Sequence, residues 1–128
     1  MSKRILIVED HADIRKLIRM TLEFESFEIH EAANADEGLE MVRQLKPDLL
    51  LLDVMMPGQL DGIDLCRIVK SDSSLGMPQV IMLTARGQAK DIETGMNAGA
   101  DAYLLKPFST LKLIETIDGL DASPAGVR

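Results

Sequence analysis

Cysteine, tryptophan and aromatic residues are scarce in this chain. Cys66 is the single cysteine among 128 residues, tryptophan is absent, and aromatic residues make up 3% of the composition. A single cysteine excludes an intramolecular disulfide and a zinc site built from several cysteines. The formal net charge is −7, and no basic run with interleaved aromatic residues offsets it. Because this charge repels a phosphate backbone, we expect no direct binding to nucleic acid.

Long hydrophobic runs are missing as well. No apolar run reaches the roughly 18 residues that span a bilayer. The apolar stretch at residues 5–8 is too short for the core of a signal peptide before Glu9 and Asp10 interrupt it. We therefore expect a cytoplasmic protein without a membrane segment. The composition, 46% hydrophobic and 27% charged, is typical of a globular protein. We expect one domain over residues 1–120 and a flexible tail over 121–128, which lacks hydrophobic periodicity.

Apolar segments of strand length alternate along the chain with segments whose apolar residues recur every three or four positions. The strand-like segments are residues 4–8, 27–31, 48–52, 79–83 and 102–105. Strict alternation predicts parallel strands joined by right-handed crossovers, with helices on both faces of the sheet. The predicted fold is therefore a doubly wound α/β sandwich, in which the alternating segment 27–31 suits a sheet edge. Helix-capping residues stand at Asn34, Asp61 and Ser109.

Polar residues follow the central strands of this predicted sheet. They are Glu9 and Asp10 after the first segment, Asp53 after the third, Thr84 after the fourth and Lys106 after the fifth. Ligands of open parallel sheets bind at this carboxyl edge. Three converging carboxylates would repel by about 4 kcal/mol per pair at about 4 Å and an effective dielectric constant of about 20, so the site needs a cation. Oxygen ligands favour Mg²⁺, and with a hydroxyl and an ammonium group they favour phosphoryl transfer to Asp53 as nucleophile.

Four motifs together carry a resemblance to a known family. They are "ED" (9–10), "LLLLDVMMPG" (49–58), "VIMLTA" (80–85) and "GADAYLLKPF" (99–108). In this order and spacing, the chain resembles a bacterial two-component response-regulator receiver domain over nearly its whole length, of the single-domain kind found in chemotaxis. The resemblance implies a flavodoxin-like (βα)5 fold with the strand order 2-1-3-4-5.

The resemblance also implies roles for the site residues. Asp53 would accept a phosphoryl group from the phosphohistidine of a sensor histidine kinase or a phosphotransfer protein. The Mg²⁺ ligands would be Asp10 and Asp53 directly, Glu9 through water, and the backbone carbonyl of Met55. Thr84 and Lys106 would bind the phosphoryl oxygens. Tyr103 would be a switch residue that acts with Thr84, and the Lys106–Pro107 peptide bond would be cis.

The same resemblance implies a signalling role in a phosphorelay. The chain would not be an enzyme beyond its own phosphoryl transfer and dephosphorylation. Phosphorylation would change the binding of an unidentified downstream protein at the face made by the fourth helix, the fifth strand and the fifth helix, roughly residues 88–119. The protein would be a monomer or a weak dimer.

Other functions fit parts of the pattern. A magnesium-dependent phosphatase usually has a second acid two positions after its nucleophile, where this chain has Met55. An interaction module that works without phosphorylation is a second alternative, and a receiver fragment of a larger regulator is a third. Ala102 stands where many DNA-binding regulators carry an acid, and the chain ends soon after its last helix, so we expect a single-domain regulator. His11 and His30 are expected to be surface residues without a chemical role.

Overall fold

The computed structural model describes residues 3–54, 56, 58–85 and 89–122, with no description of the side chains at 91, 121 and 122. Its strands are β1 (Lys3–Val8), β2 (Phe27–Ala32), β3 (Leu49–Asp53), β4 (Gln79–Ala85) and β5 (Ala102–Lys106). Its helices are α1 (Ala12–Leu22), α2 (Ala35–Leu45), α3 (Gly62–Ser71), α4 (Ala89–Asn97) and α5 (Thr110–Ala122), with a short 3₁₀ helix at Ser73–Leu75. The strands form one parallel sheet in the order β2-β1-β3-β4-β5, which confirms the predicted fold.

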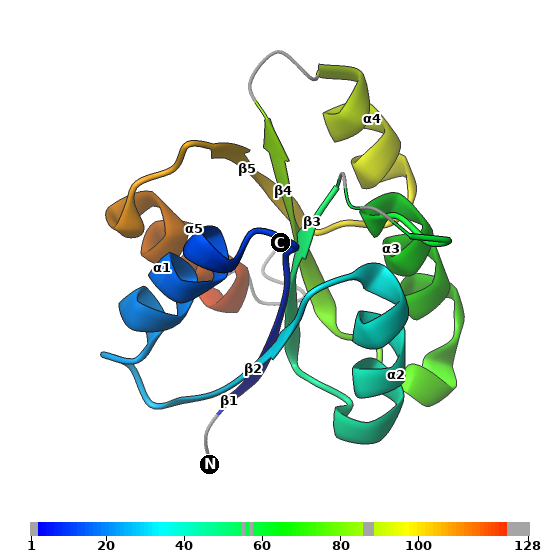
Figure 1. Ribbon diagram of the computed structural model, residues 1–128, viewed down its shortest axis with the longest axis horizontal. Helices are drawn as coiled ribbons and strands as arrows, with labels where there is room; N and C mark the ends of the chain where they lie inside the picture. Colours follow the sequence, from blue (N-terminus) through cyan, green and yellow to red (C-terminus); the bar gives the residue numbers. More distant parts are fainter. Residues whose placement is uncertain (1–2, 55, 57, 86–88, 123–128) are drawn as a thin grey trace.

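The sheet separates two hydrophobic layers. Helices α1 and α5 cover one face, and α2, α3 and α4 cover the other (Figure 1). Successive residues of β3 alternate between these layers, with Leu49 and Leu51 in the α1/α5 layer and Leu50 and Leu52 in the opposite layer. All four leucines are fully buried because helices cover both faces of this central strand. The alternating segment 27–31 forms most of β2, which lies at the sheet edge as predicted.

The predicted capping residues bind the first turns of their helices. The Asn34 side chain accepts from the Glu37 amide at 2.8 Å, and the Asp61 side chain accepts from the Asp64 amide at 2.9 Å. Ser109 Oγ accepts from the Lys112 amide at 3.0 Å. These bonds satisfy amides that have no partner inside their own helices, and so fix where α2, α3 and α5 begin.

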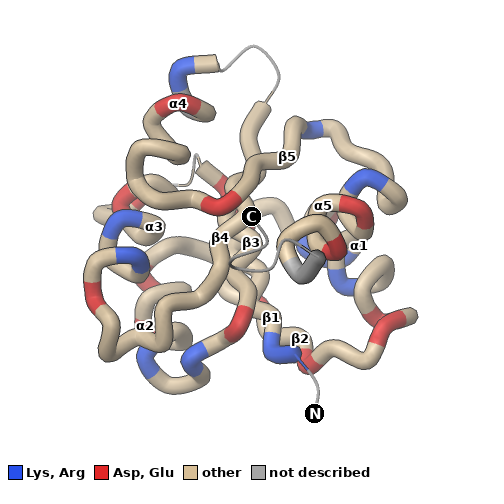
Figure 2. Tube along the Cα trace, turned by 180° about the vertical axis from the view of Figure 1, so that it is seen from behind, with Lys and Arg blue, Asp and Glu red and all other residues tan. Residues whose placement is uncertain are grey.

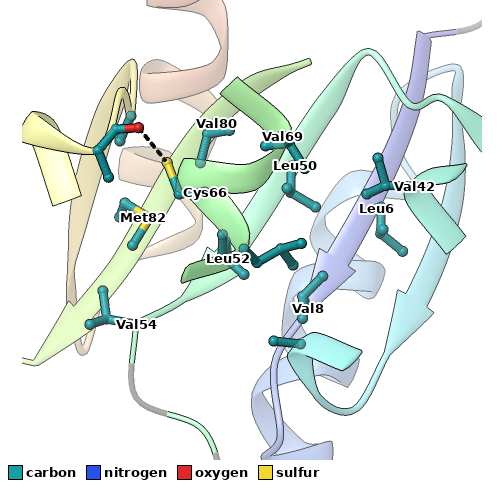
Figure 3. Close-up of a cluster of buried hydrophobic side chains, with 14 of the residues drawn as sticks. Leu6, Val8, Val42, Leu50, Leu52, Val54, Cys66, Val69, Val80 and Met82 are labelled. Atoms are coloured by element: carbon teal, nitrogen blue, oxygen red, sulfur yellow. Dashed lines mark hydrogen bonds between the residues drawn. The ribbon is translucent and has the colours of Figure 1, made fainter. Parts of the chain in front are cut away.

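Cys66 is a residue of α3 and lies in the layer covered by α2, α3 and α4, in the same buried cluster as Val80 and Met82 of β4 (Figure 3). Its thiol is fully buried, and Sγ donates a weak hydrogen bond to the Ala98 carbonyl oxygen at 3.8 Å. Burial raises the pKa of the Cys66 thiol to about 11. The thiol therefore behaves as a small apolar packing residue.

The surface carries charges of both signs. Figure 2 shows Lys and Arg interspersed with Asp and Glu over the helices and strand ends. Within the described ranges, no helix has the length and apolar character needed to cross a membrane. Helix α5 continues to Ala122, two residues past the domain boundary expected at 120, and the rest of the expected tail lies outside the described residues.

Candidate functional site

The carboxyl ends of three neighbouring strands bring a compact polar cluster together. Glu9 follows β1, Asp53 is the last residue of β3, and Thr84 is the next-to-last residue of β4. Their exposed fractions are 0%, 4% and 2%, respectively. These are the buried polar residues of the described chain, and they all lie at this edge of the sheet. Asp53 is therefore more deeply buried than a strand-terminal position by itself suggests.

Lys106, at the end of β5, joins two of the carboxylates. Its Nζ lies 2.7 Å from Glu9 Oε1 and 3.1 Å from Asp53 Oδ1. Burial disfavours the ammonium form, but the hydrogen bond to Glu9 and the charges of both carboxylates outweigh it and raise the pKa of Lys106. The lysine is thus a fixed positive charge between the first and third strands.

Glu9 and Asp53 respond to this environment in opposite directions. Burial acts to raise the pKa of Glu9, but hydrogen bonds from Lys106 and from both the backbone and the ring of His11 lower it overall. For Asp53, burial and the negative charge of Glu9 prevail over Lys106 and raise the pKa to about 7. One buried acid is therefore held ionised, whereas the other ionises only near neutral pH in the metal-free protein.

Three buried side-chain oxygens at this edge make no hydrogen bond to any described residue. They are Asp10 Oδ1, Asp53 Oδ2 and Thr84 Oγ1. One potential ligand atom from each of Glu9, Asp10, His11 and Asp53 lies within 4.8 Å of the others. Unpaired buried oxygens are costly unless something binds them. Carboxylates with free oxygens at this spacing fit a divalent cation, and Mg²⁺ prefers such ligands.

Arg15 on α1 supports the loop that carries the acid pair. Its Nη1 donates to the Glu9 carbonyl oxygen at 2.8 Å, and its Nε donates to Glu31 Oε1 at 3.1 Å. Arg19, one turn along, binds the other oxygen of the same Glu31 carboxylate and the Ile29 carbonyl, so it holds the same acid without reaching Glu9. Arg15 thus ties the backbone next to the cluster to the edge strand β2.

Gly62 lets α3 begin directly against the strand that carries Asp53. Its amide donates to the Val54 carbonyl oxygen at 3.1 Å, and the Val54 amide donates to the Leu83 carbonyl oxygen at 3.0 Å. A Cβ at position 62 would lie 1.9 Å from the Asp53 carbonyl oxygen. Only glycine fits this approach, so the end of β3 is fixed between β4 and the first turn of α3.

Comparison with known proteins assigns the family. The family model described as "Response regulator receiver domain" matches residues 5–118. The chain belongs to this family. The receiver domain is 39% identical over 117 residues to the DNA-binding response regulator MtrA of Mycobacterium tuberculosis, a match that covers 91% of this chain and 50% of the relative. It is 42% identical over 117 residues to the transcriptional regulatory protein ResD of Bacillus subtilis, covering 91% and 47%. The chain thus spans about half the length of these curated relatives.

Solved structures share the fold of this receiver domain. A CheY-like response regulator receiver domain protein from Methanospirillum hungatei superposes with a TM-score of 0.85 at 34% identity, covering 95% of this chain and 96% of that one. The chemotaxis response regulator CheY4 of Vibrio cholerae gives a TM-score of 0.86 at 27% identity, covering 94% and 99%. The resemblance inferred from the sequence motifs is therefore confirmed at the level of family and fold.

The structure of the receiver domain brings most of the predicted site residues together. Glu9, Asp10, Asp53 and Lys106 meet at the carboxyl edge of the sheet, with Thr84 buried on the neighbouring strand. Met55, predicted to offer a backbone carbonyl, lies outside the described residues. The Lys106–Pro107 bond is cis, as expected, and Tyr103 lies on β5 with 43% of its surface exposed.

Three residues that contact or support the site, His11, Arg15 and Gly62, were not predicted from the sequence. His11 was expected to be a surface residue without a role, and its side chain is indeed 64% exposed, but its Nδ1 lies 3.0 Å from Glu9 Oε2. Its position directly after the acid pair was the available signal. Arg15 could be recognised only from the packing of α1 against β2, and Gly62 only from the close approach of two backbones.

Proposed function

We propose that this receiver domain accepts a phosphoryl group on Asp53 from the phosphohistidine of a histidine kinase or a phosphotransfer protein. The observation that carries the proposal is the environment of the Asp53 carboxyl group. One oxygen lies 3.1 Å from Lys106 Nζ, and the other is buried without a hydrogen-bond partner among the described residues. A buried carboxylate with one oxygen held and one oxygen free is suited to act as a nucleophile.

The proposed step is an in-line displacement at phosphorus. A carboxylate oxygen of Asp53 forms the new P–O bond while the P–N bond to the donor imidazole breaks, and the electron pair of that bond stays on the leaving nitrogen. Lys106 would then bind a phosphoryl oxygen, and the unpaired hydroxyl of Thr84 would donate to another. Both residues would stabilise the negative charge on the oxygens of the phosphoryl group during its transfer.

The acid cluster would hold Mg²⁺ for this step. Asp10 and Asp53 would be direct ligands, Glu9 would act through water, and the Met55 carbonyl, outside the described residues, would complete the protein's share. When bound, the ion neutralises the carboxylates and the phosphoryl oxygens. Lys106 and the His11 backbone amide each donate to one oxygen of Glu9, so the protein itself orients this carboxylate.

The test is phosphorylation with Mg²⁺ and a small phosphodonor, followed by location of the phosphoryl group by peptide mass spectrometry. We expect the wild type and Asp118→Asn, an exposed control on α5, to be labelled at residue 53. Asp53→Asn keeps the shape of the side chain but lacks the nucleophile. We expect this variant to be labelled much more slowly than the wild type. Equal labelling of Asp53→Asn, or wild-type label on another residue, would contradict the proposal.

Phosphorylation would be read out on the face made by α4, β5 and α5. Tyr103 pairs with Met82 across β4 and β5, and Leu105 pairs with Thr84, so Thr84 and Tyr103 belong to the same side of the sheet. A hollow of about 620 Å³ on this face is lined by residues that include Tyr103, Pro107 and Lys112. Drawing Thr84 toward a phosphoryl group would open space into which Tyr103 can rotate, and so change the shape of this hollow.

Thr84→Ala tests this coupling. We expect a phosphoryl mimic to shift the amide resonances of residues 89–119 in the wild type and much less in Thr84→Ala, because the variant lacks the hydroxyl that follows the phosphoryl group. Equal shifts in both proteins would exclude Thr84 as the coupling residue. The match to MtrA and ResD covers about half of each relative. It therefore supports the receiver role, and it is no evidence on DNA binding by this chain.

A further inference from the structure

The imidazole of His11 lies at the mouth of the acid cluster. His11 Nδ1 is 3.0 Å from Glu9 Oε2 and 3.2 Å from Asp10 Oδ1. It is the nitrogen donor of the four described residues whose ligand atoms lie within 4.8 Å of one another. The other members of this set offer carboxylate oxygens. The cluster is therefore a mixed nitrogen and oxygen donor set.

The position of the ring is not explained by helix capping. His11 is the N-cap residue of α1, but its side chain accepts no hydrogen bond from the first turn. The ring turns back toward Glu9 instead, although the His11 backbone amide already donates to the same Glu9 oxygen at 3.0 Å. Glu9 Oε1 is bound by Lys106 at 2.7 Å. Both oxygens of Glu9 thus keep a donor if the ring of His11 turns to another partner.

The cluster offers such a partner oxygens that make no hydrogen bond. Asp10 Oδ1 lies near the ring but makes no hydrogen bond, and neither does Asp53 Oδ2 within the described part of the chain. The Asp53 side chain is 5% exposed, so its free oxygen is withdrawn from bulk water. The His11 side chain is 64% exposed and can turn without disturbing the core. Because carboxylates only accept, Nδ1 carries the hydrogen in the observed contact, and that hydrogen would move to Nε2 or to solvent when Nδ1 binds a cation.

We propose that His11 is a metal ligand that makes this site selective for late first-row divalent ions, such as Co²⁺ or Ni²⁺, over Mg²⁺. Imidazole nitrogen is a good ligand for these ions, whereas Mg²⁺ prefers oxygen and keeps much of its water. His11 therefore strengthens the binding of the transition ion and contributes little to Mg²⁺ binding. The inference uses the acid cluster of the proposed function, but it does not require that Asp53 be phosphorylated.

Calorimetric titration of the metal-free chain with CoCl₂ and with MgCl₂ tests the assignment. Removing a residue that only hydrogen-bonds a metal ligand commonly lowers metal affinity about 10- to 100-fold. Removing a direct ligand should cost at least as much, so we expect His11→Gln to weaken Co²⁺ binding by at least about tenfold. We expect Mg²⁺ affinity to change by less than about twofold. His30→Gln is the matched control, because His30 also contacts a glutamate, Glu28 at 2.8 Å, but on β2 and outside the four-residue cluster. It should match the wild type with both ions.

The visible absorption of bound Co²⁺ gives a second reading that a purely structural role would not change. We expect the spectrum to differ between the wild type and His11→Gln at saturating Co²⁺, and to be the same in the wild type and His30→Gln. His11→Asn, which places a favourable N-cap residue on α1, should repeat the loss if His11→Gln fails to fold. Equal Co²⁺ affinity in all variants, or an equal loss for Co²⁺ and Mg²⁺, would overturn the proposal. Either result would leave phosphorylation of Asp53 untouched, since that is measured separately.

Discussion

Neutralising Asp53 should stabilise the metal-free protein, although it removes an ion pair from the core. Asp53→Asn removes the negative charge from the 3.1 Å contact with Lys106, but Lys106 keeps its 2.7 Å ion pair with Glu9. Asp53 is 4% exposed, so in the wild type the ionised form lacks solvation by bulk water and lies beside the charge of Glu9. The asparagine keeps the size of the side chain without that charge. We therefore expect a higher free energy of unfolding for the variant.

The pKa of Asp53 sets the size and the pH dependence of this gain. Burial and the charge of Glu9 raise it from the ordinary 3.8 to about 7. Well below its ordinary pKa of 3.8, the Asp53 carboxyl group is protonated in both the folded and the unfolded chain, so its charge has no effect on stability. As pH rises, the unfolded chain ionises first and the folded state becomes relatively less stable. The gain from Asp53→Asn is then about 2 kcal/mol at pH 5 and at most about 4 kcal/mol at pH 8, where the effect is complete.

Urea unfolding with a chelator present measures this difference at pH 5 and pH 8. Asp118→Asn, at an exposed position of α5, is the control and should change the free energy of unfolding by less than about 0.5 kcal/mol at either pH. Mg²⁺ should raise the stability of the wild type more than that of Asp53→Asn, because the variant has lost a charged ligand. If Asp53→Asn is less stable than the wild type at pH 8, the ion pair with Lys106 outweighs the burial of charge and this reasoning is wrong.

Two further predictions concern residues that support the site. Arg15→Met should lower Mg²⁺ affinity by about tenfold, because the Glu9 carbonyl oxygen loses its donor at 2.8 Å. Arg19→Met, which removes a side chain that binds Ile29 instead, should leave Mg²⁺ affinity unchanged. Equal affinities of the two variants in calorimetry would exclude a positioning role for Arg15. Gly62→Ala should lower the free energy of unfolding in urea by at least about 3 kcal/mol, because its Cβ would lie 1.9 Å from a backbone oxygen of β3. Gly119→Ala is the control: no atom lies within 4 Å of its new Cβ, so it should stabilise α5 by about 0.5–1 kcal/mol. Similar effects of the two substitutions would refute the close approach at Gly62.

The fold could be predicted because its strands and helices leave strong local patterns. The four leucines at 49–52 can be buried on both sides only in a central strand covered by helices, and the structure has them in that position. Alternation with helical segments then sets the parallel direction. The strand ends differ from the predicted ones by one or two residues, as at β4, which continues through Thr84 to Ala85. The extension follows from pairing with β5, a contact that the sequence of β4 does not contain.

The site was predictable only for residues at strand ends, because parallel strands bring their carboxyl ends to one edge of the sheet, where ligands bind. That rule brought Glu9, Asp53 and Lys106 together, and their contacts agree with it. It gave no information on side chains that reach the edge from elsewhere. The ring of His11 turns back over two residues, and Arg15 reaches Glu9 from inside α1. Both contacts depend on rotamers and helix packing, which have no periodic pattern in the sequence.

The burial of Cys66 makes the chain convenient for site-specific labelling. Thiol reagents attack the thiolate, and a fully buried thiol with a pKa of about 11 offers almost none at neutral pH. A cysteine introduced on the surface would then be the one reactive position while the native sequence stays otherwise intact. Met96 on α4 is 41% exposed and so could be exchanged for this purpose. A fluorophore attached to Met96→Cys would report directly on movements of α4 when a phosphodonor is added.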